Sequence, residues 1–239
     1  MSVSRHTVAG TVLTMPVQIR KADVHTAMFS VSADAAQRLV DYSGLEVFRH
    51  RPGRAIVTLM LARYLDGDLG RYNEFGTCVM VRPPGSPARG LRALGDAAAF
   101  IHHLPVDQAF TLEAGRSIWG SPKLMADFTV RDSTPFSFEV SEGGSLIAAM
   151  QFRRGFPVPS LRKRPQILTT YSCGDGTTRE VPWEMVNRQV RVRPGGATLR
   201  LGDHPYATEL ASLGLPKRPM LSGSVGHVAM SFGDGRVVR

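Results

Sequence analysis

Residues 115–126 read Gly115-Arg-Ser-Ile-Trp-Gly-Ser-Pro-Lys123-Leu-Met-Ala and place one lysine among small and apolar side chains. The chain has three other lysines, and each stands beside an arginine: Lys21, Lys163 and Lys217. Those three are typical of solvated basic surfaces, whereas Lys123 has no charged residue next to it. Lys123 is therefore the first candidate for a chemical role.

A lysine in apolar surroundings suits the formation of a Schiff base with a ketone. A free lysine has a pKa of about 10.4, so almost none of it is neutral amine at pH 7. Burial in an apolar pocket can lower the pKa of a lysine by up to about 3–5 pH units, and a nearby cation acts in the same direction. The alternative interpretation of Lys123 is a surface residue whose stem packs on apolar side chains while its ammonium reaches water.

The length and composition of the chain predict one globular domain over residues 1–239. The 239 residues are 43% hydrophobic and 21% charged, which is enough for a single large core and argues against disorder. Pro157–Pro165 is the only candidate boundary, and its prolines favour a long surface loop over a linker.

Strand-like runs separated by glycine-rich or proline-rich turns predict a β-rich α+β fold with helices packed outside a barrel or sandwich. The predicted helices are Ser32–Tyr42, Leu91–Phe100 and Tyr206–Leu213. The predicted strands are Val24–Ser32, Arg54–Ala62, Asn73–Val81, Phe110–Glu113, Met125–Val130, Phe136–Val140, Leu146–Phe152, Gln166–Tyr171, Gln189–Arg193, Ala197–Leu201 and Ser224–Phe232.

The charge and the cysteines limit the classes of partner and compartment. The net charge is +9, and 25 of the 29 basic residues are arginines scattered along the chain without a nucleic-acid-binding motif, so we expect no nucleic acid partner. Cys78 and Cys173 form no CxxC pair, no apolar run approaches the roughly 20 residues that span a bilayer, and no secretory signal is present. We expect a cytoplasmic protein that does not enter a membrane.

Two motifs resemble the acetoacetate decarboxylase superfamily. The first is Gly115-Arg116-Ser117 followed by Pro122-Lys123-Leu124, which is similar to the Gly-Arg-Glu…Pro-Lys-Lys pattern around the Schiff-base lysine of that family. The second is Tyr72-Asn73-Glu74, which stands where family members carry an acidic residue in a Tyr-x-Glu context.

The resemblance extends over most of the chain. The early strand-to-helix passage of the family is similar to Ala27–Val40, and its late strand-to-helix passage is similar to Leu199–His204. The closing strand of the family is similar to the stretch from Leu213–Pro216 through Ser224–Met230. The fold that this resemblance implies is a closed, cone-like β-barrel of antiparallel strands, with a few peripheral helices and an interior active site. It also implies a homo-oligomer and no cofactor or metal.

The resemblance implies roles for individual residues. Lys123 matches the nucleophile, and Glu74 matches the active-site acid, which could position substrate or move a proton. Arg116 matches the arginine of the motif, which we interpret as structural, and Trp119 is a candidate for the pocket wall. The alternative for Glu74 is an ion pair with Arg71 or Arg82 at the end of a strand.

The sequence departs from the family pattern at two positions. Leu124 replaces the second lysine, so a cationic neighbour of Lys123 is lost and burial must favour the neutral amine. Leu124 is therefore a candidate for the apolar wall of the pocket. The early arginine that contacts substrate in the family aligns near Ala22, with Arg20 beside it, and Arg20 is the candidate to replace it.

The remaining motifs predict no further chemistry. His102-His103 lack a cysteine, aspartate or glutamate at ligand spacing and do not predict a zinc site, and no GxGxxG or GxSxG motif stands in a suitable context. The sequence thus predicts a lyase that forms a Schiff base with a small keto acid. Decarboxylation of acetoacetate or another β-keto acid is the first prediction, and an aldolase or dehydratase acting on a pyruvate-like acid without decarboxylation is the alternative. A non-catalytic ligand-binding barrel, with Lys123 exposed, is the alternative from another class.

Overall fold

The computed structural model describes residues 4–86, 97–159 and 165–238, and strands dominate these ranges. The largest sheet has twelve strands, which are β3 (Val17–Ser32), β4 (Glu46–Val47), β5 (Arg49–Arg51), β6 (Arg54–Gly67), β7 (Tyr72–Arg82), β8 (Ala98–Val106), β9 (Lys123–Met125), β13 (Phe156–Pro157), β14 (Gln166–Gly174), β15 (Thr177–Pro194), β17 (Leu221–Phe232) and β18 (Arg236–Val237).

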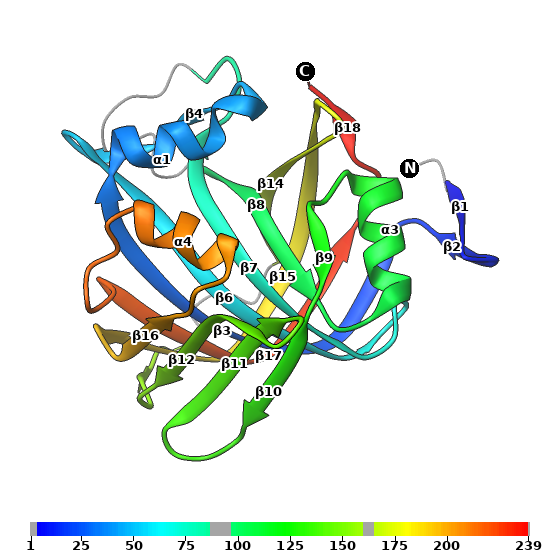
Figure 1. Ribbon diagram of the computed structural model, residues 1–239. Coiled ribbons are helices and arrows are strands. Elements are labelled where there is room, and N and C mark those ends of the chain that lie inside the picture. The colour runs from blue at the N-terminus through cyan, green and yellow to red at the C-terminus, as the bar shows by residue number, and fades with distance from the viewer. Residues whose placement is uncertain (1–3, 87–96, 160–164, 239) are drawn as a thin grey trace.

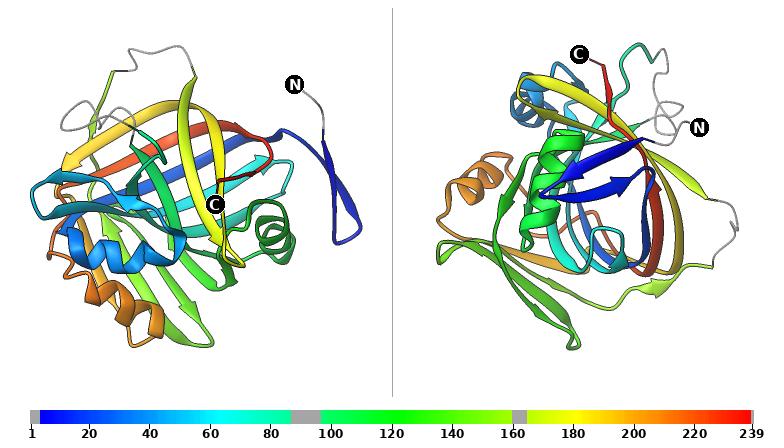
Figure 2. Two further views of the ribbon diagram at one scale, coloured as in Figure 1. Left: turned by 90° about the horizontal axis from the view of Figure 1, so that it is seen from above. Right: turned by 90° about the vertical axis from the view of Figure 1, so that its right-hand side faces the viewer.

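Seven strands of this sheet form a ring. Their order is β7-β6-β3-β17-β15-β14-β8, and a further pairing of β8 with β7 joins the two ends. Neighbouring strands of the ring are antiparallel, except that β8 and β14 are parallel. Figure 2 shows β15, β17, β3 and β6 side by side along the curved wall. The ring confirms the expected β-rich fold, with this one parallel pairing as an exception to the antiparallel order.

Smaller elements cover the ring. A four-stranded sheet contains β10 (Asp127–Arg131), β11 (Phe136–Glu142), β12 (Ser145–Phe152) and β16 (Ala197–Leu201), and β1 (Arg5–Val8) pairs with β2 (Thr11–Thr14) in a hairpin. The helices are α1 (Ala33–Val40), η1 (Asp41–Ser43), α3 (Ala109–Trp119) and α4 (Pro205–Ser212). Figure 1 shows α1 and α4 together on one side of the molecule and α3 on the other, beside β9.

The two faces of the ring strands support separate cores, because successive side chains of a strand point to opposite faces. On β6, Leu59 and Leu61 belong to an outer core with α1, α4 and the four-stranded sheet. Ala62 and Tyr64 belong to a second core with Trp119 of α3. The inner face of the ring therefore has its own apolar environment, separated by the strands from the outer core.

The structure corrects two of the predicted elements near the key lysine. Phe110–Glu113 is not a strand but the start of α3, because the Gln108 side chain caps the helix by accepting from the Thr111 N–H and Gly120 ends it with a left-handed φ of 62°. Of the predicted helix Leu91–Phe100, residues 91–96 lie outside the described ranges, and Ala98–Phe100 begin strand β8. The helix predicted at Ser32–Tyr42 is confirmed as α1 and η1, with Ser32 as its N-cap.

Candidate active site

A small cavity of about 30 Å³ lies inside the ring around Lys123. Its wall draws residues from β6, β7, β8, β9, β14, β15 and β17, and strands on all sides of the ring thus face the same space. The wall is mainly aromatic and aliphatic. It is lined by Tyr64, Leu69, Tyr72, Glu74, Ile101, Leu104, Trp119, Ser121, Lys123, Thr170, Ser172, Val181, Trp183 and Phe232.

Lys123 and Glu74 form a buried ion pair in this wall. The Lys123 Nζ lies 2.7 Å from Glu74 Oε2, and the two residues are 6% and 2% exposed. The alternative pairing of Glu74 with Arg71 or Arg82 is wrong, since Arg82 pairs with Glu46 instead and Glu74 faces the interior. A charged pair taken out of water needs good geometry and further hydrogen bonds to be retained.

Neighbouring hydroxyl groups supply those hydrogen bonds. Lys123 Nζ donates to Thr111 Oγ1 at 3.0 Å, and the Tyr64 hydroxyl donates to Glu74 Oε1 at 2.9 Å. The ammonium also lies 5.2 Å from the centre of the Tyr72 ring, which stacks on Tyr64. Burial, aided by the charge of Glu74, raises the pKa of both tyrosines well above the usual value, so both phenols stay protonated.

Gly115 provides the space through which the Lys123 side chain reaches the cavity. A Cβ atom at position 115 would lie 2.5 Å from both Cδ and Cε of Lys123, closer than a real Cβ approaches another heavy atom. Gly115 is on α3 and Lys123 begins β9, which pairs in parallel with β8. The glycine of the Gly115-Arg116 motif is therefore required by the lysine that follows eight residues later.

Arg116 holds the main chain at Lys123. Its Nε and Nη2 atoms donate to the Lys123 carbonyl oxygen at 2.9 and 2.5 Å. The guanidinium does not line the cavity, which agrees with the expected structural role. Glycine and arginine of the motif thus act on the same lysine, one by leaving space for its stem and the other by fixing its backbone.

Trp119 closes one side of the cavity. Its indole Nε1 donates to the Gly233 carbonyl at 2.8 Å, and its ring meets Phe232 edge to face. The Ser172 hydroxyl donates to the Trp119 carbonyl oxygen at 2.6 Å. These contacts connect the end of α3 to β14 and β17, and they place Trp119 in the wall as expected.

Two other predicted site residues lie elsewhere. Leu124 packs against the outer core and does not line the cavity, because it follows Lys123 on the same strand and faces the other way. Arg20 is 53% exposed at its side chain and pairs with Asp66 and Asp68, each at 2.7 Å. Ala22, the position that aligns near the early arginine, is buried in the inner core. No arginine is among the described residues that line the cavity.

Sequence reasoning missed several polar residues of the cavity. Thr111, which accepts a hydrogen bond from Lys123, lies in a segment that was predicted as a strand, and Tyr64 lies within β6, beyond the predicted strand Arg54–Ala62 and with no motif around it. Thr170 and Ser172 are buried polar residues at alternate positions of β14. Their spacing of two within a strand was the available signal, because alternate residues face the same side.

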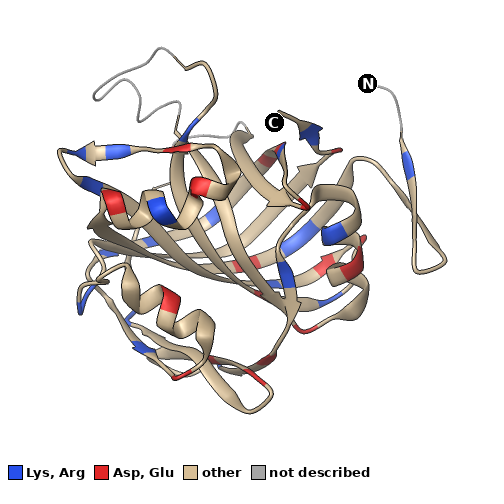
Figure 3. Ribbon diagram, turned by 45° about the horizontal axis from the view of Figure 1, so that its top comes forward, with Lys and Arg blue, Asp and Glu red and all other residues tan. Residues whose placement is uncertain are grey.

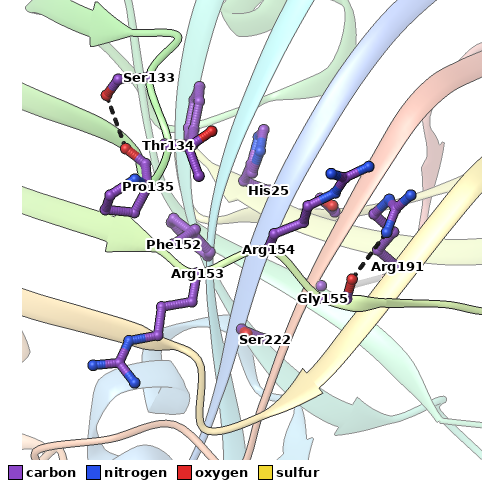
Figure 4. A pocket seen from close by; sticks show the side chains of 13 residues that line it. His25, Ser133, Thr134, Pro135, Phe152, Arg153, Arg154, Gly155, Arg191 and Ser222 are labelled. Carbon is purple, nitrogen blue, oxygen red and sulfur yellow. Dashed lines mark hydrogen bonds between the residues drawn. The ribbon is translucent and has the colours of Figure 1, made fainter.

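A second pocket lies on the outer side of β3, away from Lys123, and has a volume of about 150 Å³ (Figure 4). His25 stacks on Phe136 with ring centres 3.8 Å apart. Burial lowers the pKa of His25 to about 4. Figure 4 shows Arg153 directed away from His25, while Arg191 donates to the Gly155 carbonyl at 3.0 Å. The arginines of this pocket do not converge on one point.

The surface charges are mixed. In the view of Figure 3 the basic residues are interspersed with acidic ones, and Arg20, Arg63 and Arg82 each pair with carboxylates. Among the described residues, no helix has the length and the apolar composition to cross a membrane. A single basic face of the kind that nucleic acid binding requires is not visible in this view.

The ring of strands encloses a buried lysine, Lys123, which pairs with one carboxylate, Glu74. This arrangement defines a class of protein with an amine site in its interior. The family model described as acetoacetate decarboxylase (ADC) matches residues 5–239, and the chain belongs to this family. The resemblance noted from the Gly115–Leu124 and Tyr72–Glu74 motifs is thereby confirmed. A search of curated protein sequences gives no significant match.

Several solved structures share the fold. Acetoacetate decarboxylase from Legionella pneumophila is 18% identical with a TM-score of 0.69, over 94% of this chain and 87% of that one. The enduracididine biosynthesis enzyme MppR, complexed with pyruvate, is 20% identical with a TM-score of 0.63, over 95% and 92%. An acetoacetate decarboxylase-like enzyme from Sphingomonas wittichii RW1 is 15% identical with a TM-score of 0.55, over 92% and 93%.

Proposed function

We propose that this protein is a cofactor-independent lyase in which Lys123 forms a Schiff base with a small keto acid. The observation that carries the proposal is the Lys123–Glu74 pair, buried in a mainly apolar cavity inside the ring. Membership of the acetoacetate decarboxylase family supports lyase chemistry. A non-catalytic barrel would leave Lys123 exposed, whereas Lys123 is 6% exposed.

The pair contains its own route to a neutral amine. Transfer of one proton across the 2.7 Å contact converts the ammonium and the carboxylate into an amine and a carboxylic acid. This transfer removes two charges from a site with little water, where charges are poorly solvated. Glu74 then holds the proton needed when the addition product loses water. Tyr64 and Thr111 keep the two groups in place.

For a β-keto acid, the amine of Lys123 adds to the ketone carbon, and loss of water leaves an iminium. The bond between the carboxylate and the carbon next to the iminium then breaks, and CO₂ departs. The electron pair of the broken bond moves into the iminium and gives an enamine. Protonation of the enamine carbon and hydrolysis by water release the ketone and restore the amine. The iminium accepts the electron pair that would otherwise form an unstable carbanion.

An aldolase or dehydratase acting on a pyruvate-like acid is the second candidate. In that reaction the carbon next to the iminium loses a proton instead of CO₂, and the resulting enamine, which keeps the carboxylate of the substrate, adds to an aldehyde. Two observations favour it: no arginine lines the cavity among the described residues, and one structural neighbour is described with the condensation product of pyruvate and imidazole 4-carboxaldehyde. Both candidates require the same lysine.

Borohydride trapping tests the shared step. The protein is incubated with acetoacetate or pyruvate and reduced, and the adduct is mapped by mass spectrometry. We expect the adduct on Lys123, its loss in Lys123→Met and its retention in the matched control Lys21→Met. An adduct on another lysine, or none with either acid, contradicts the proposal. CO₂ release in the unreduced reaction separates decarboxylation from aldol chemistry.

A further inference from the structure

His102 and His103 lie on the outer face of the ring, and a β-bulge makes both of them point there. Consecutive residues of a regular strand alternate between faces. Here Thr77 of β7 is opposite His103 while Cys78 is opposite Ile101, so His102 is the extra residue of the bulge. Ile101 and Leu104 on either side both line the Lys123 cavity, and the two histidines both reach α4.

The two imidazoles meet a carboxylate from a distant part of the chain. His102 Nε2 and His103 Nε2 lie 2.8 and 2.7 Å from the same oxygen, Oε1 of Glu209 on α4. Sequence reasoning found no acidic residue at ligand spacing, because Glu209 is 107 positions from His102 along the chain. Folding supplies the third group that the His102-His103 pair lacked.

This donor set suits a divalent metal ion of the zinc class. The three ligand atoms lie within 4.8 Å of one another, and two imidazole nitrogens with one carboxylate oxygen are typical zinc ligands. Bonds of about 2.0–2.1 Å in a tetrahedral site separate ligand atoms by about 3.3 Å. Glu209 therefore needs to withdraw by about half an ångström, which its place on the partly exposed side of α4 allows.

The surroundings also match a metal-binding histidine. The Tyr42 hydroxyl lies 3.0 Å from His102 Nδ1, the ring nitrogen that would not bind the metal, and such outer contacts fix ring orientation. The side chain of His102 is 7% exposed, whereas those of His103 and Glu209 are 26% and 38% exposed. The cluster is thus anchored on one side and open to water on the other, where a fourth ligand can bind.

We propose that His102, His103 and Glu209 bind a divalent metal ion of the zinc class, which joins β8 to α4 and keeps one position open to water. The site is separate from Lys123, because its two histidines lie on the face of β8 opposite the cavity and Glu209 reaches them from α4. A hydrogen-bonded cluster that binds no metal is the competing explanation. A metal site predicts that one zinc ion binds per chain and that binding weakens when one of the three ligand residues is replaced. A metal-free cluster predicts neither result.

Titration calorimetry of the chelator-treated protein with Zn²⁺ tests the site. We expect one ion per chain, binding at least about tenfold weaker in His103→Gln and in Glu209→Gln, and about ten- to a hundredfold weaker in Tyr42→Phe. The matched control is Glu142→Gln, which removes the single-histidine contact of Glu142 with His204 and should leave zinc affinity unchanged.

Thermal unfolding with and without Zn²⁺ gives a second readout, since a ligand that binds only the folded state raises Tm. We expect the rise in the wild type and in Glu142→Gln, and its loss in Glu209→Gln. Circular dichroism checks that each variant is folded. If His103→Gln does not fold, Glu209→Gln alone tests the dependence of zinc binding on a ligand residue. No saturable binding by the wild type, or equal binding by wild type and Glu209→Gln, overturns the proposal.

Discussion

Ionisable clusters lie on both sides of the sheet at β7 and β8, and the two clusters differ in their access to water. On the inner face, Lys123 and Glu74 form a pair whose side chains are 5% and 3% exposed. On the outer face, His102 and His103 share Glu209, which is 38% exposed. Among the described residues, the further partners of the inner pair are hydroxyl groups and the Tyr72 ring, whereas water can solvate the outer cluster.

Because of this difference, the two faces tolerate a change in charge to different extents. Removing one partner of a buried pair leaves a charge without compensation, while a partly exposed group regains contact with water. The inner face is therefore suited to a reaction that moves one proton between two groups. The outer face is suited to binding, where a ligand replaces water.

Replacing Lys123 is the strongest way to break the inner cluster. We expect Lys123→Met to abolish adduct formation and turnover, and to lower the free energy of unfolding by about 3–5 kcal/mol because Glu74 loses its partner. The double variant Lys123→Met with Glu74→Gln should recover part of this stability without activity. Urea unfolding and borohydride trapping measure the two effects. A double variant no more stable than Lys123→Met contradicts the charge explanation.

Gly115→Ala tests whether the position of the inner lysine matters as much as its presence. The new Cβ would lie 2.5 Å from the stem of Lys123. We expect Lys123 to be displaced and kcat to fall by about a hundredfold, with a loss of about 1–3 kcal/mol in unfolding free energy from overpacking. Gly233→Ala is the control, since a Cβ there meets nothing within 4 Å. Unchanged kcat in Gly115→Ala contradicts the steric account.

Acid provides a way to weaken the outer face through His25. Burial lowers the pKa of His25 to about 4, with Asp23 and Asp132 opposing and Arg63 reinforcing the shift. Its pKa in the unfolded chain is about 6.5. Between these values the unfolded chain binds the proton and the folded chain does not, so stability falls as the pH falls from 6.5 towards 4.

We expect His25 to contribute a loss of about 2 kcal/mol in unfolding free energy at pH 5 relative to pH 8. His25→Phe, which retains the stacking on Phe136, should lack this part of the pH dependence in urea unfolding at the two pH values. Phe136→Leu is the control, and it should lower the unfolding free energy by a similar amount at the two pH values. Identical pH profiles for wild type and His25→Phe would contradict a neutral buried imidazole.

Tyr64→Phe refines the account of the inner cluster with the smallest change. It removes the hydroxyl that donates to Glu74 Oε1 and keeps the ring that stacks on Tyr72. We expect a loss of about 1 kcal/mol in unfolding free energy and a reduced rate of adduct formation. The control is Tyr171→Phe, whose hydroxyl donates to Glu180 and whose side chain belongs to the outer core, on the face of β14 opposite the Lys123 cavity. Equal adduct rates in both variants would remove Tyr64 from the site.

The sequence predicted the β-rich fold and the central residues of the inner site. Lys123 and Glu74, chosen from separate motifs, meet at 2.7 Å, and Trp119 lines the same cavity. The structure brings these residues together because each motif places a residue type with a local requirement, such as Gly115, which leaves space for the Lys123 side chain. Their roles in catalysis stay a prediction. The prediction that Arg20 contacts substrate has no support in the cavity, since neighbouring Asp66 and Asp68 hold it at the surface.

The rest depends on contacts that local patterns do not encode. Strand β8 was missed because its bulge breaks the alternation of apolar residues, and the same bulge creates the outer cluster. Glu209 reaches His102 only once α4 has packed beside the sheet. The start of α3 was predicted as a strand because four residues of alternating polarity fit both periods, and its caps decide the outcome.

Arg116 donates its hydrogen bonds to the backbone carbonyl oxygen of residue 123 and not to the side chain. The support of the main chain at this position is therefore separate from the amine that the side chain carries. Every amino acid has that carbonyl oxygen, so the main chain at this point is held in the same way whatever side chain follows. Chemical modification can exploit this: Lys123→Cys, made together with Cys78→Ala and Cys173→Ala so that one thiol is left, and alkylated in the unfolded state with bromoethylamine, places a sulfur-containing lysine analogue on the same backbone support. Amines of different basicity can thus be compared at position 123 on one unchanged backbone.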